Sequence, residues 1–170
     1  LVIFFRDQHL THDQHKDFGR RFGELAVHPS SPHSPEGHPE ILTIHADENS
    51  KHVAGEEWHS DVSCAPEPPM GSILYLTEIP EVGGDTLFAS MYAAYERLSP
   101  PLQRLVEGLT AVHDGEPVYR GRFGHSGGDK GYPRAEHPIV RTHPGTGRKA
   151  LFVNRNFTTR INGLSKLESD

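Results

Sequence analysis

Short apolar runs alternate along the chain with polar stretches rich in proline and glycine, and this pattern predicts many strands and few helices. Brief runs of apolar and β-branched residues bounded by turn residues are typical of strands. The sequence therefore predicts a buried strand at 1–6 and further strands at 40–45, 58–62, 72–76, 86–88 and 110–113. It also predicts a β-hairpin that pairs 138–142 with 149–154 around 144–147.

Helices are indicated mainly by their capping residues. A capping-box pattern at 11–14, followed by apolar residues at helical spacing, predicts a helix over about 12–25. Serine N-caps predict helices over about 91–98 and 100–108. A second capping-box pattern at 165–168 predicts the start of a last helix at the end of the sequence.

The predicted elements indicate one domain of mainly β class with helical additions, a sandwich or barrel. At 170 residues the chain can bury one sizeable core. Residue 1 already lies within an apolar run, and the last predicted helix has only its first turn, so we expect 1–170 to be a single catalytic domain truncated at both ends. Residues 28–39 form a predicted loop, and the glycine-rich loop 115–133 is a candidate lid.

Charge and composition narrow the class of protein. A net charge of −6 argues against a nucleic-acid partner, which normally selects a basic surface. A single cysteine, Cys64, excludes an intrachain disulfide framework and fits a reducing compartment. The sequence has no secretory signal and no apolar run long enough to span a membrane. We expect a cytoplasmic protein with no membrane partner, and homo-oligomer formation stays open.

The sequence His-x-Asp occurs three times and supplies the candidate chemistry. On a strand, such a His and Asp point to the same face and could supply two legs of the 2-His-1-carboxylate set that binds non-haem Fe(II). His15 and Asp17 lie in a predicted helix, where such positions do not face each other. His45 and Asp47 follow a predicted strand and stay open as a pair. His59 and Asp61 lie on the predicted strand 58–62, which could also be a polar surface strand.

The surroundings of His59 and Asp61 resemble the taurine dioxygenase family of Fe(II)/2-oxoglutarate-dependent oxygenases. The resemblance begins with the sequence Trp-His-Ser-Asp-Val and continues in order through almost the whole chain. Its matching segments are 58–62, 68–74, 83–90, 93–95, 98–99, 137–144, 151–154 and 157–161. It implies a double-stranded β-helix, or jelly roll, that is incomplete in this chain.

The resemblance also implies residue roles. His59 and Asp61 match the proximal histidine and the carboxylate of the iron site, and Thr86 matches the threonine that binds a carboxylate of 2-oxoglutarate. The implied substrate-binding residues are His28, Val62 and Phe157. Without the family, Thr86 could be a strand residue after a turn and His28 a loop histidine. Two further histidines that precede proline, His137 and His143, shape a hairpin in the family pattern.

The implied reaction uses Fe(II), molecular oxygen and 2-oxoglutarate as cosubstrate. It hydroxylates a small organic acid and releases succinate and CO₂. Trp58 and the phenylalanines are expected to keep the pocket dry. The family's distal histidine and its 2-oxoglutarate-binding arginine are expected beyond residue 170.

Two departures from the family pattern bear on the substrate. A pocket tyrosine of the founding member is replaced by Ser31, and an asparagine by Gly55. Both changes widen the predicted pocket, which favours a bulkier sulfonate, a sulfate ester or an aryloxy acid over taurine. The alternative is a truncated, catalytically inactive β-scaffold. A zinc hydrolase would also use His and Asp ligands. However, the sequence has no third ligand or general base at a spacing that would indicate such an enzyme.

Overall fold

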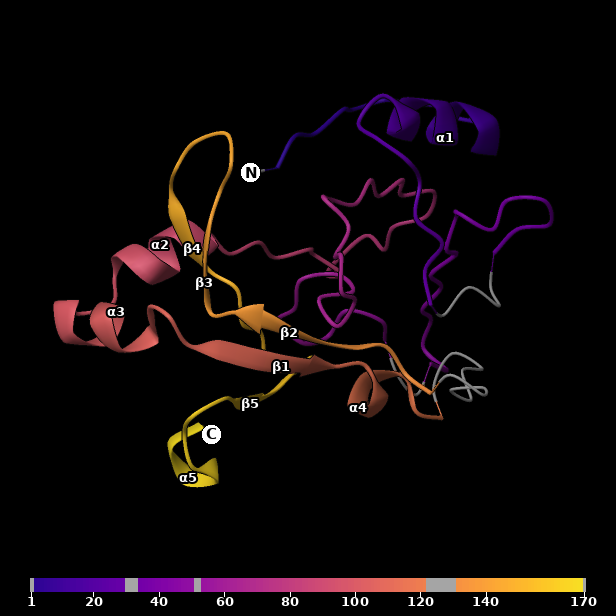
Figure 1. The fold of residues 1–170 in the computed structure, drawn as a ribbon. Helices are drawn as coiled ribbons and strands as arrows, with labels where there is room; N and C mark the ends of the chain where they lie inside the picture. Colours follow the sequence, from indigo (N-terminus) through magenta and orange to yellow (C-terminus); the bar gives the residue numbers. More distant parts are fainter. Residues whose placement is uncertain (1, 30–33, 51–52, 122–130, 170) are drawn as a thin grey trace.

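The structure is a computed structural model that describes residues 2–29, 34–50, 53–121 and 131–169. Within these ranges it contains five helices and five strands (Figure 1). The helices are α1 (His12–Arg20), α2 (Met91–Glu96), α3 (Pro100–Val106), α4 (Glu116–Tyr119) and α5 (Lys166–Ser169). The strands are β1 (Thr110–Asp114), β2 (Arg134–Pro138), β3 (Val140–Thr142), β4 (Lys149–Leu151) and β5 (Thr158–Ile161).

β1 is the centre of an antiparallel three-stranded sheet in the order β2-β1-β5. Its three middle residues are all buried, so both of its faces are covered. The pairing with β5 shifts register between Val112 and His113, where a β-bulge interrupts the ladder. β3 and β4 form a separate antiparallel hairpin. The predicted strand at 110–113 and the predicted hairpin are thus confirmed.

The predicted helices are confirmed, with shorter ends. α1 begins at a complete capping box, in which the Thr11 side chain accepts from the Gln14 backbone and the Gln14 side chain accepts from the Thr11 backbone. It ends at Arg20 rather than near residue 25: Arg21 is its C-cap, and Gly23 follows two residues later with a φ of 150°. Ser90 caps α2 through the Ala93 N–H, and Pro100 occupies the first position of α3. α1 stands apart from the three-stranded sheet (Figure 1).

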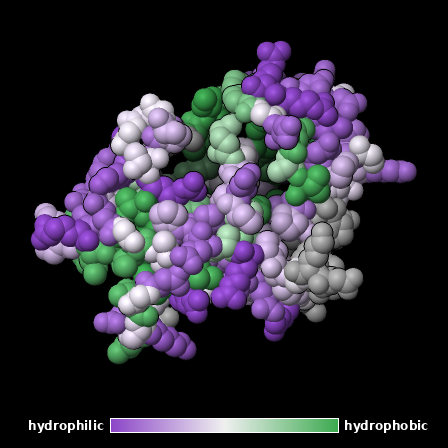
Figure 2. Space-filling view, viewed as in Figure 1, coloured by the Kyte–Doolittle hydropathy of each residue, from purple (hydrophilic) through white to green (hydrophobic). Residues whose placement is uncertain are grey.

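Five of the predicted strands are wrong. The described residues of 1–6, 40–45, 58–62, 72–76 and 86–88 are not strands. A strand needs a hydrogen-bonded neighbour, and none of these segments has a ladder partner among the described residues. Many of their apolar side chains are exposed, including those of Ile3, Phe4, Leu74 and Phe88. Figure 2 shows apolar residues gathered at the surface around a hollow.

The largest fully buried side chains are those of Ser63, Cys64, His113 and Ile139. Residues 63–65 contact the sheet through Ser63, which meets His113, and through the Ala65 carbonyl, which meets His137. His113 comes from β1, and its ring stacks on Phe152, with ring centroids 5.4 Å apart. The polar members of this core therefore need hydrogen-bond partners inside it. None of the helices in the described part of the chain combines the length and the apolar character that a membrane span requires.

The burial of His113 makes the stability of the fold depend on pH. Loss of solvation, with a smaller effect of nearby His137, lowers the pKa of His113 to about 4, whereas a histidine in an unfolded chain titrates near 6.5. Between these pH values the unfolded chain binds a proton at His113, whereas the folded chain does not. The free energy of unfolding therefore falls as the pH falls from about 6.5 to about 4, by roughly 3 kcal/mol in all.

Urea unfolding at several pH values measures this slope. His113→Leu removes the titrating group, so we expect a flatter slope between pH 6.5 and 4 even though the variant is less stable throughout. His45→Ala, which changes an exposed histidine, is the matched control and should keep the original slope. An unchanged slope in His113→Leu would contradict the assignment.

Candidate metal and cosubstrate site

His59 and Asp61 face each other, although the segment that carries them is not a strand. The His59 Nε2 lies 3.1 Å from the Asp61 Oδ1. Asp61 begins a turn over 61–64, in which Val62 adopts a positive φ of 48°. The two side chains thus converge through a turn rather than through the alternation of a strand. The side chains are 27% and 49% exposed, so the pair is open to a ligand.

Each member of the pair is held by a second partner. The His59 Nδ1 lies 2.7 Å from the Glu57 carbonyl oxygen, and because a carbonyl only accepts, Nδ1 carries the proton. Nε2 is therefore the nitrogen that can bind a metal. The Ser72 hydroxyl donates to the Asp61 Oδ2, which leaves Oδ1 directed at His59. Hydrogen bonds of this kind orient the ligands of metal sites.

The electrostatics of the pair agree with this geometry. The hydrogen bond from His59 lowers the pKa of Asp61, and the Ser72 hydroxyl lowers it further. The same hydrogen bond raises the pKa of His59. The hydrogen bond thus stabilises the charged form of each side chain, and a divalent cation bound between them would displace the proton that they share.

A buried cluster packs against Val62, the residue that follows Asp61. Cys64, Tyr119 and Phe157 are buried together, and Val62 packs against them. The Tyr119 ring lies 5.8 Å from the Phe157 ring and meets the His28 ring edge-on at 5.9 Å. The structure thus gathers three predicted substrate-binding residues, His28, Val62 and Phe157, on the side of Asp61. Their roles stay predictions.

Tyr119 is the member of this cluster that the sequence analysis missed. It lies on α4, within the region 115–133 that was predicted to be a loop, and only 2% of it is exposed. Loss of solvation raises the pKa of its hydroxyl and raises that of the Cys64 thiol to about 11, so both are neutral. The sequence offered one signal: Gly115 followed by Pro117 at the start of a short helix.

Other predicted site residues are not joined to the pair. Thr86 lies in an exposed segment before α2, and no hydrogen bond between described residues links it to His59 or Asp61. Trp58 is 53% exposed and does not close the site. Ser31 and residues 122–130 of the candidate lid lie outside the described residues. Gly55 is adjacent to the pair, since a Cβ at this position would lie 3.6 Å from the His59 Cε1.

The structure separates the three His-x-Asp sequences. His15 and Asp17 have different partners: His15 meets the Ile73 carbonyl, and Asp17 meets Arg20. The Nε2 of His45 and the Oδ2 of Asp47 are 3.9 Å apart and well exposed. Asp47 also accepts hydrogen bonds within its own turn, which lower its pKa. His59 and Asp61 thus form the closest pair of the three.

The two histidines that precede proline have different places. His143 lies in the turn between β3 and β4, where its Nδ1 accepts from the backbone of Gly145 and Thr146, so it shapes the hairpin as expected. His137 lies on β2 instead, and its Nε2 is 2.9 Å from the Ala65 carbonyl. The expectation that His137 shapes the hairpin is wrong, because its side chain contacts Ala65, in the segment after Asp61.

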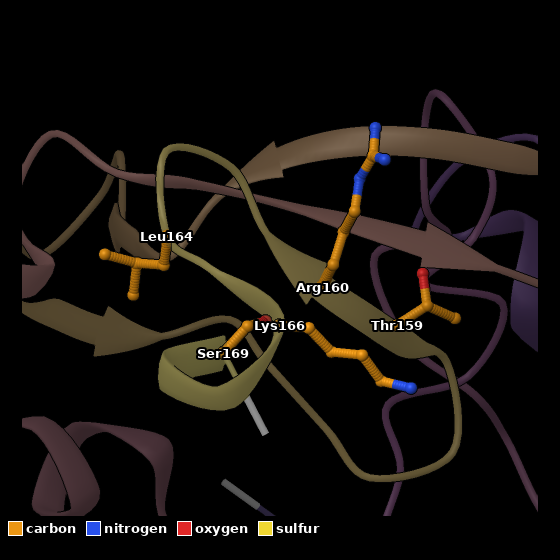
Figure 3. A pocket seen from close by; sticks show the side chains of 5 residues that line it. All are labelled: Thr159, Arg160, Leu164, Lys166 and Ser169. Atoms are coloured by element: carbon orange, nitrogen blue, oxygen red, sulfur yellow. The ribbon is translucent and has the colours of Figure 1, made fainter.

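The described residues contain no cluster of three His, Cys, Asp or Glu side chains that could hold a metal ion. His59 and Asp61 could thus supply two ligands at most, and their role as metal ligands stays a prediction. A cavity of about 390 Å³ lies elsewhere, near β5 and α5, and Figure 3 shows the residues around it. These are Thr159, Arg160, Leu164, Lys166 and Ser169, and none of them is a predicted site residue.

Comparisons with known proteins decide the family. Residues 1–170 match the family model described as "Taurine catabolism dioxygenase TauD, TfdA family". The chain belongs to this family. It is 33% identical over 99% of its length to an alpha-ketoglutarate-dependent sulfonate dioxygenase of Saccharomyces cerevisiae, and covers 44% of that protein. It is 34% identical, again over 99% of its length, to an alpha-ketoglutarate-dependent sulfate ester dioxygenase of Pseudomonas putida, and covers 58% of it.

Solved structures agree with the family. A taurine dioxygenase from Burkholderia xenovorans is 38% identical and superposes with a TM-score of 0.75 over 97% of this chain and 53% of its own. The expected fold class, an incomplete jelly roll with helical additions, is thereby confirmed. The chain spans about half the length of the curated relatives that it matches.

The packing of Tyr119 depends on a glycine. A Cβ at Gly115 would lie 2.9 Å from the Cδ2 and Cε2 of Tyr119 and 3.1 Å from the Cγ of Pro133. Gly115→Ala should therefore lower the free energy of unfolding by about 1–3 kcal/mol, the usual cost of overpacking.

Urea denaturation measures the effect of Gly115→Ala. Gly71→Ala is the matched control, because a Cβ there meets nothing within 4 Å, and it should change stability little. Equal stabilities of the two variants would show that Tyr119 is not packed against Gly115.

Proposed function

We propose that this chain is part of an Fe(II)- and 2-oxoglutarate-dependent dioxygenase that hydroxylates a small organic acid. The observation that carries the proposal is the facing pair of His59 and Asp61, 3.1 Å apart, in a chain of the TauD, TfdA family. An imidazole and a carboxylate are two of the three ligands of non-haem Fe(II) oxygenase sites. The relatives named above for alpha-ketoglutarate, which is 2-oxoglutarate, support the cosubstrate.

His59 and Asp61 are suitable as two of the ligands of ferrous iron. His59 Nε2 and Asp61 Oδ1 would hold the ion, and each side chain is already oriented by its second partner. We propose that the third ligand and the cation that pairs with 2-oxoglutarate come from polypeptide after residue 170 in the complete protein. Iron with 2-oxoglutarate and oxygen would supply the oxidising chemistry, with succinate and CO₂ as products.

The other site residues have binding roles in this proposal. Thr86 would donate its hydroxyl to a carboxylate of 2-oxoglutarate. His28 would contact the anionic group of the substrate. Val62 and Phe157, supported by buried Tyr119, would form an apolar wall that excludes water and directs one C–H bond of the substrate toward the metal.

The substrate class follows from the pocket and from the relatives. Gly55 leaves the space beside His59 open, where the family pattern has an asparagine. We therefore propose a sulfonate or sulfate ester larger than taurine, or an aryloxy acid. Hydroxylation of the carbon next to the heteroatom gives an unstable product that expels sulfite, sulfate or a phenol.

We further propose a cytoplasmic enzyme without a nucleic-acid partner. The single cysteine and the net charge of −6 support this. Homo-oligomer formation stays open.

A screen for succinate release tests the function. The complete protein, which includes the polypeptide that is proposed to supply the third ligand, is incubated with Fe(II), 2-oxoglutarate and oxygen, together with sulfonates, alkyl sulfates or aryloxyacetates. We expect succinate formation that depends on both iron and substrate. A competing proposal, an inactive β-scaffold, is favoured by the lack of a third ligand among the described residues. A folded protein that releases no succinate with any of these compounds would favour the scaffold.

Asp61→Ala tests the metal pair. Loss of the carboxylate should weaken the binding of Fe(II) or Mn(II) by more than the roughly 10–100-fold cost of losing an outer-shell partner. Metal titration followed by the electron paramagnetic resonance signal of free Mn(II) measures this. Asp47→Ala, from the looser His-x-Asp sequence, is the matched control and should bind metal as before. Equal affinities of the two variants would reject the pair.

Thr86→Ala tests the cosubstrate role. Loss of one hydrogen bond to a charged group should raise the apparent KM for 2-oxoglutarate roughly tenfold or more. Thr86→Ser keeps the hydroxyl and should stay close to the original KM. The KM is measured by succinate formation, and an unchanged value in Thr86→Ala would remove this residue from the cosubstrate site.

A further inference from the structure

A buried polar network ties the segment after Asp61 to the sheet. The Ser63 hydroxyl lies 3.0 Å from the Nδ1 of His113, which comes from β1. The Asn154 Nδ2 donates to the same hydroxyl at 2.9 Å. Ser63 and His113 are completely buried. The family resemblance assigned no role to Ser63 or His113.

The hydrogen bonds of this network run in one direction. The Asn154 Oδ1 accepts from the Phe157 N–H at 2.9 Å, which fixes Nδ2 as the donor toward Ser63. Ser63 has one hydroxyl proton, and its remaining partner in the described structure is the Nδ1 of His113. The hydroxyl therefore donates to that nitrogen, and His113 is neutral. The order is Phe157 N–H to Asn154, Asn154 to Ser63, and Ser63 to His113.

The segment held by the network contains strained backbone. Val62 is β-branched and adopts a φ of 48°, a conformation that persists only where its surroundings enforce it. The next three residues supply that enforcement. Ser63 binds His113 and Asn154, Cys64 is buried with Tyr119, and the Ala65 carbonyl meets the Nε2 of His137 at 2.9 Å.

We propose that Ser63, His113 and Asn154 are positioning residues that set Asp61 relative to His59 and to the wall at Phe157. The proposal rests on the proposed function. Asp61 immediately precedes the strained Val62, so the turn decides where its carboxylate points. Through Asn154 the same network holds the Phe157 backbone. The metal pair and the substrate wall are thereby placed by one connected set of buried bonds.

Ser63→Ala tests the proposal because it removes both bonds of the hydroxyl at once. The readout is the Mn(II) affinity of the whole protein, measured at a temperature where circular dichroism shows it folded; a merely structural role would not change this affinity. We expect a loss of 10–100-fold, the usual effect of an outer-shell change. Ser60→Ala is the matched control. Ser60 lies between His59 and Asp61 in the sequence, and its side chain makes no hydrogen bond to a described residue. The Mn(II) affinity of Ser60→Ala should therefore be unchanged.

Two further variants keep the test decisive. Asn154→Asp preserves the acceptor for the Phe157 N–H but loses the donor to Ser63, so it should weaken Mn(II) binding even if Ser63→Ala does not fold. Because the residues act as one unit, adding His113→Phe to Ser63→Ala should cost little more than the first change.

The outcomes separate this proposal from the proposed function. Unchanged Mn(II) affinity in folded Ser63→Ala or Asn154→Asp, in a protein that releases succinate, would overturn the positioning role and leave the function standing. An unsubstituted protein that neither binds Mn(II) nor releases succinate would overturn both.

Discussion

The burial of Ser63 and Cys64 against the sheet is the constraint on which the candidate site depends. Residues 53–90 contain no helix or strand, so no ladder holds His59 and Asp61 in place. Their geometry comes instead from the few residues that follow them into the core. β1 supplies the fixed side of this contact, because both of its faces are covered. A short turn that packs against the sheet thus brings His59 and Asp61 together, whereas the sequence predicted that a strand would do so.

The helix starts and the β-hairpin were predicted correctly from the sequence, because residues within each segment determine them. The capping box at Thr11, the N-cap at Ser90 and the proline at the start of α3 are all present. The hairpin of β3 and β4 formed around its predicted turn, where His143 binds the backbone. Each of these elements is specified by residues close together in the sequence, so its own segment was sufficient evidence.

Strand pairing could not be read in this way. Residues 72–76 and 86–88 have the composition of strands, but a strand is defined by a partner elsewhere in the chain. Where a partner exists, as for β1, the prediction was right; where none lies among the described residues, it was wrong. The same holds for Tyr119 and His113, because only the three-dimensional structure shows that one contacts His28 and the other Ser63. His59 and Asp61 were found through the His-x-Asp pattern and the family resemblance, although a turn and not the expected strand brings them together.

The left-handed backbone of Val62 has a consequence for attempts to make the protein more robust. Glycine or asparagine adopts this conformation more readily than valine, so selection for heat resistance is expected to favour them at this position. Such a gain would come from relaxing the turn next to Asp61, and the orientation of this carboxylate would be lost as resistance to unfolding was gained. At this position thermal robustness and the proposed binding of a metal thus oppose each other.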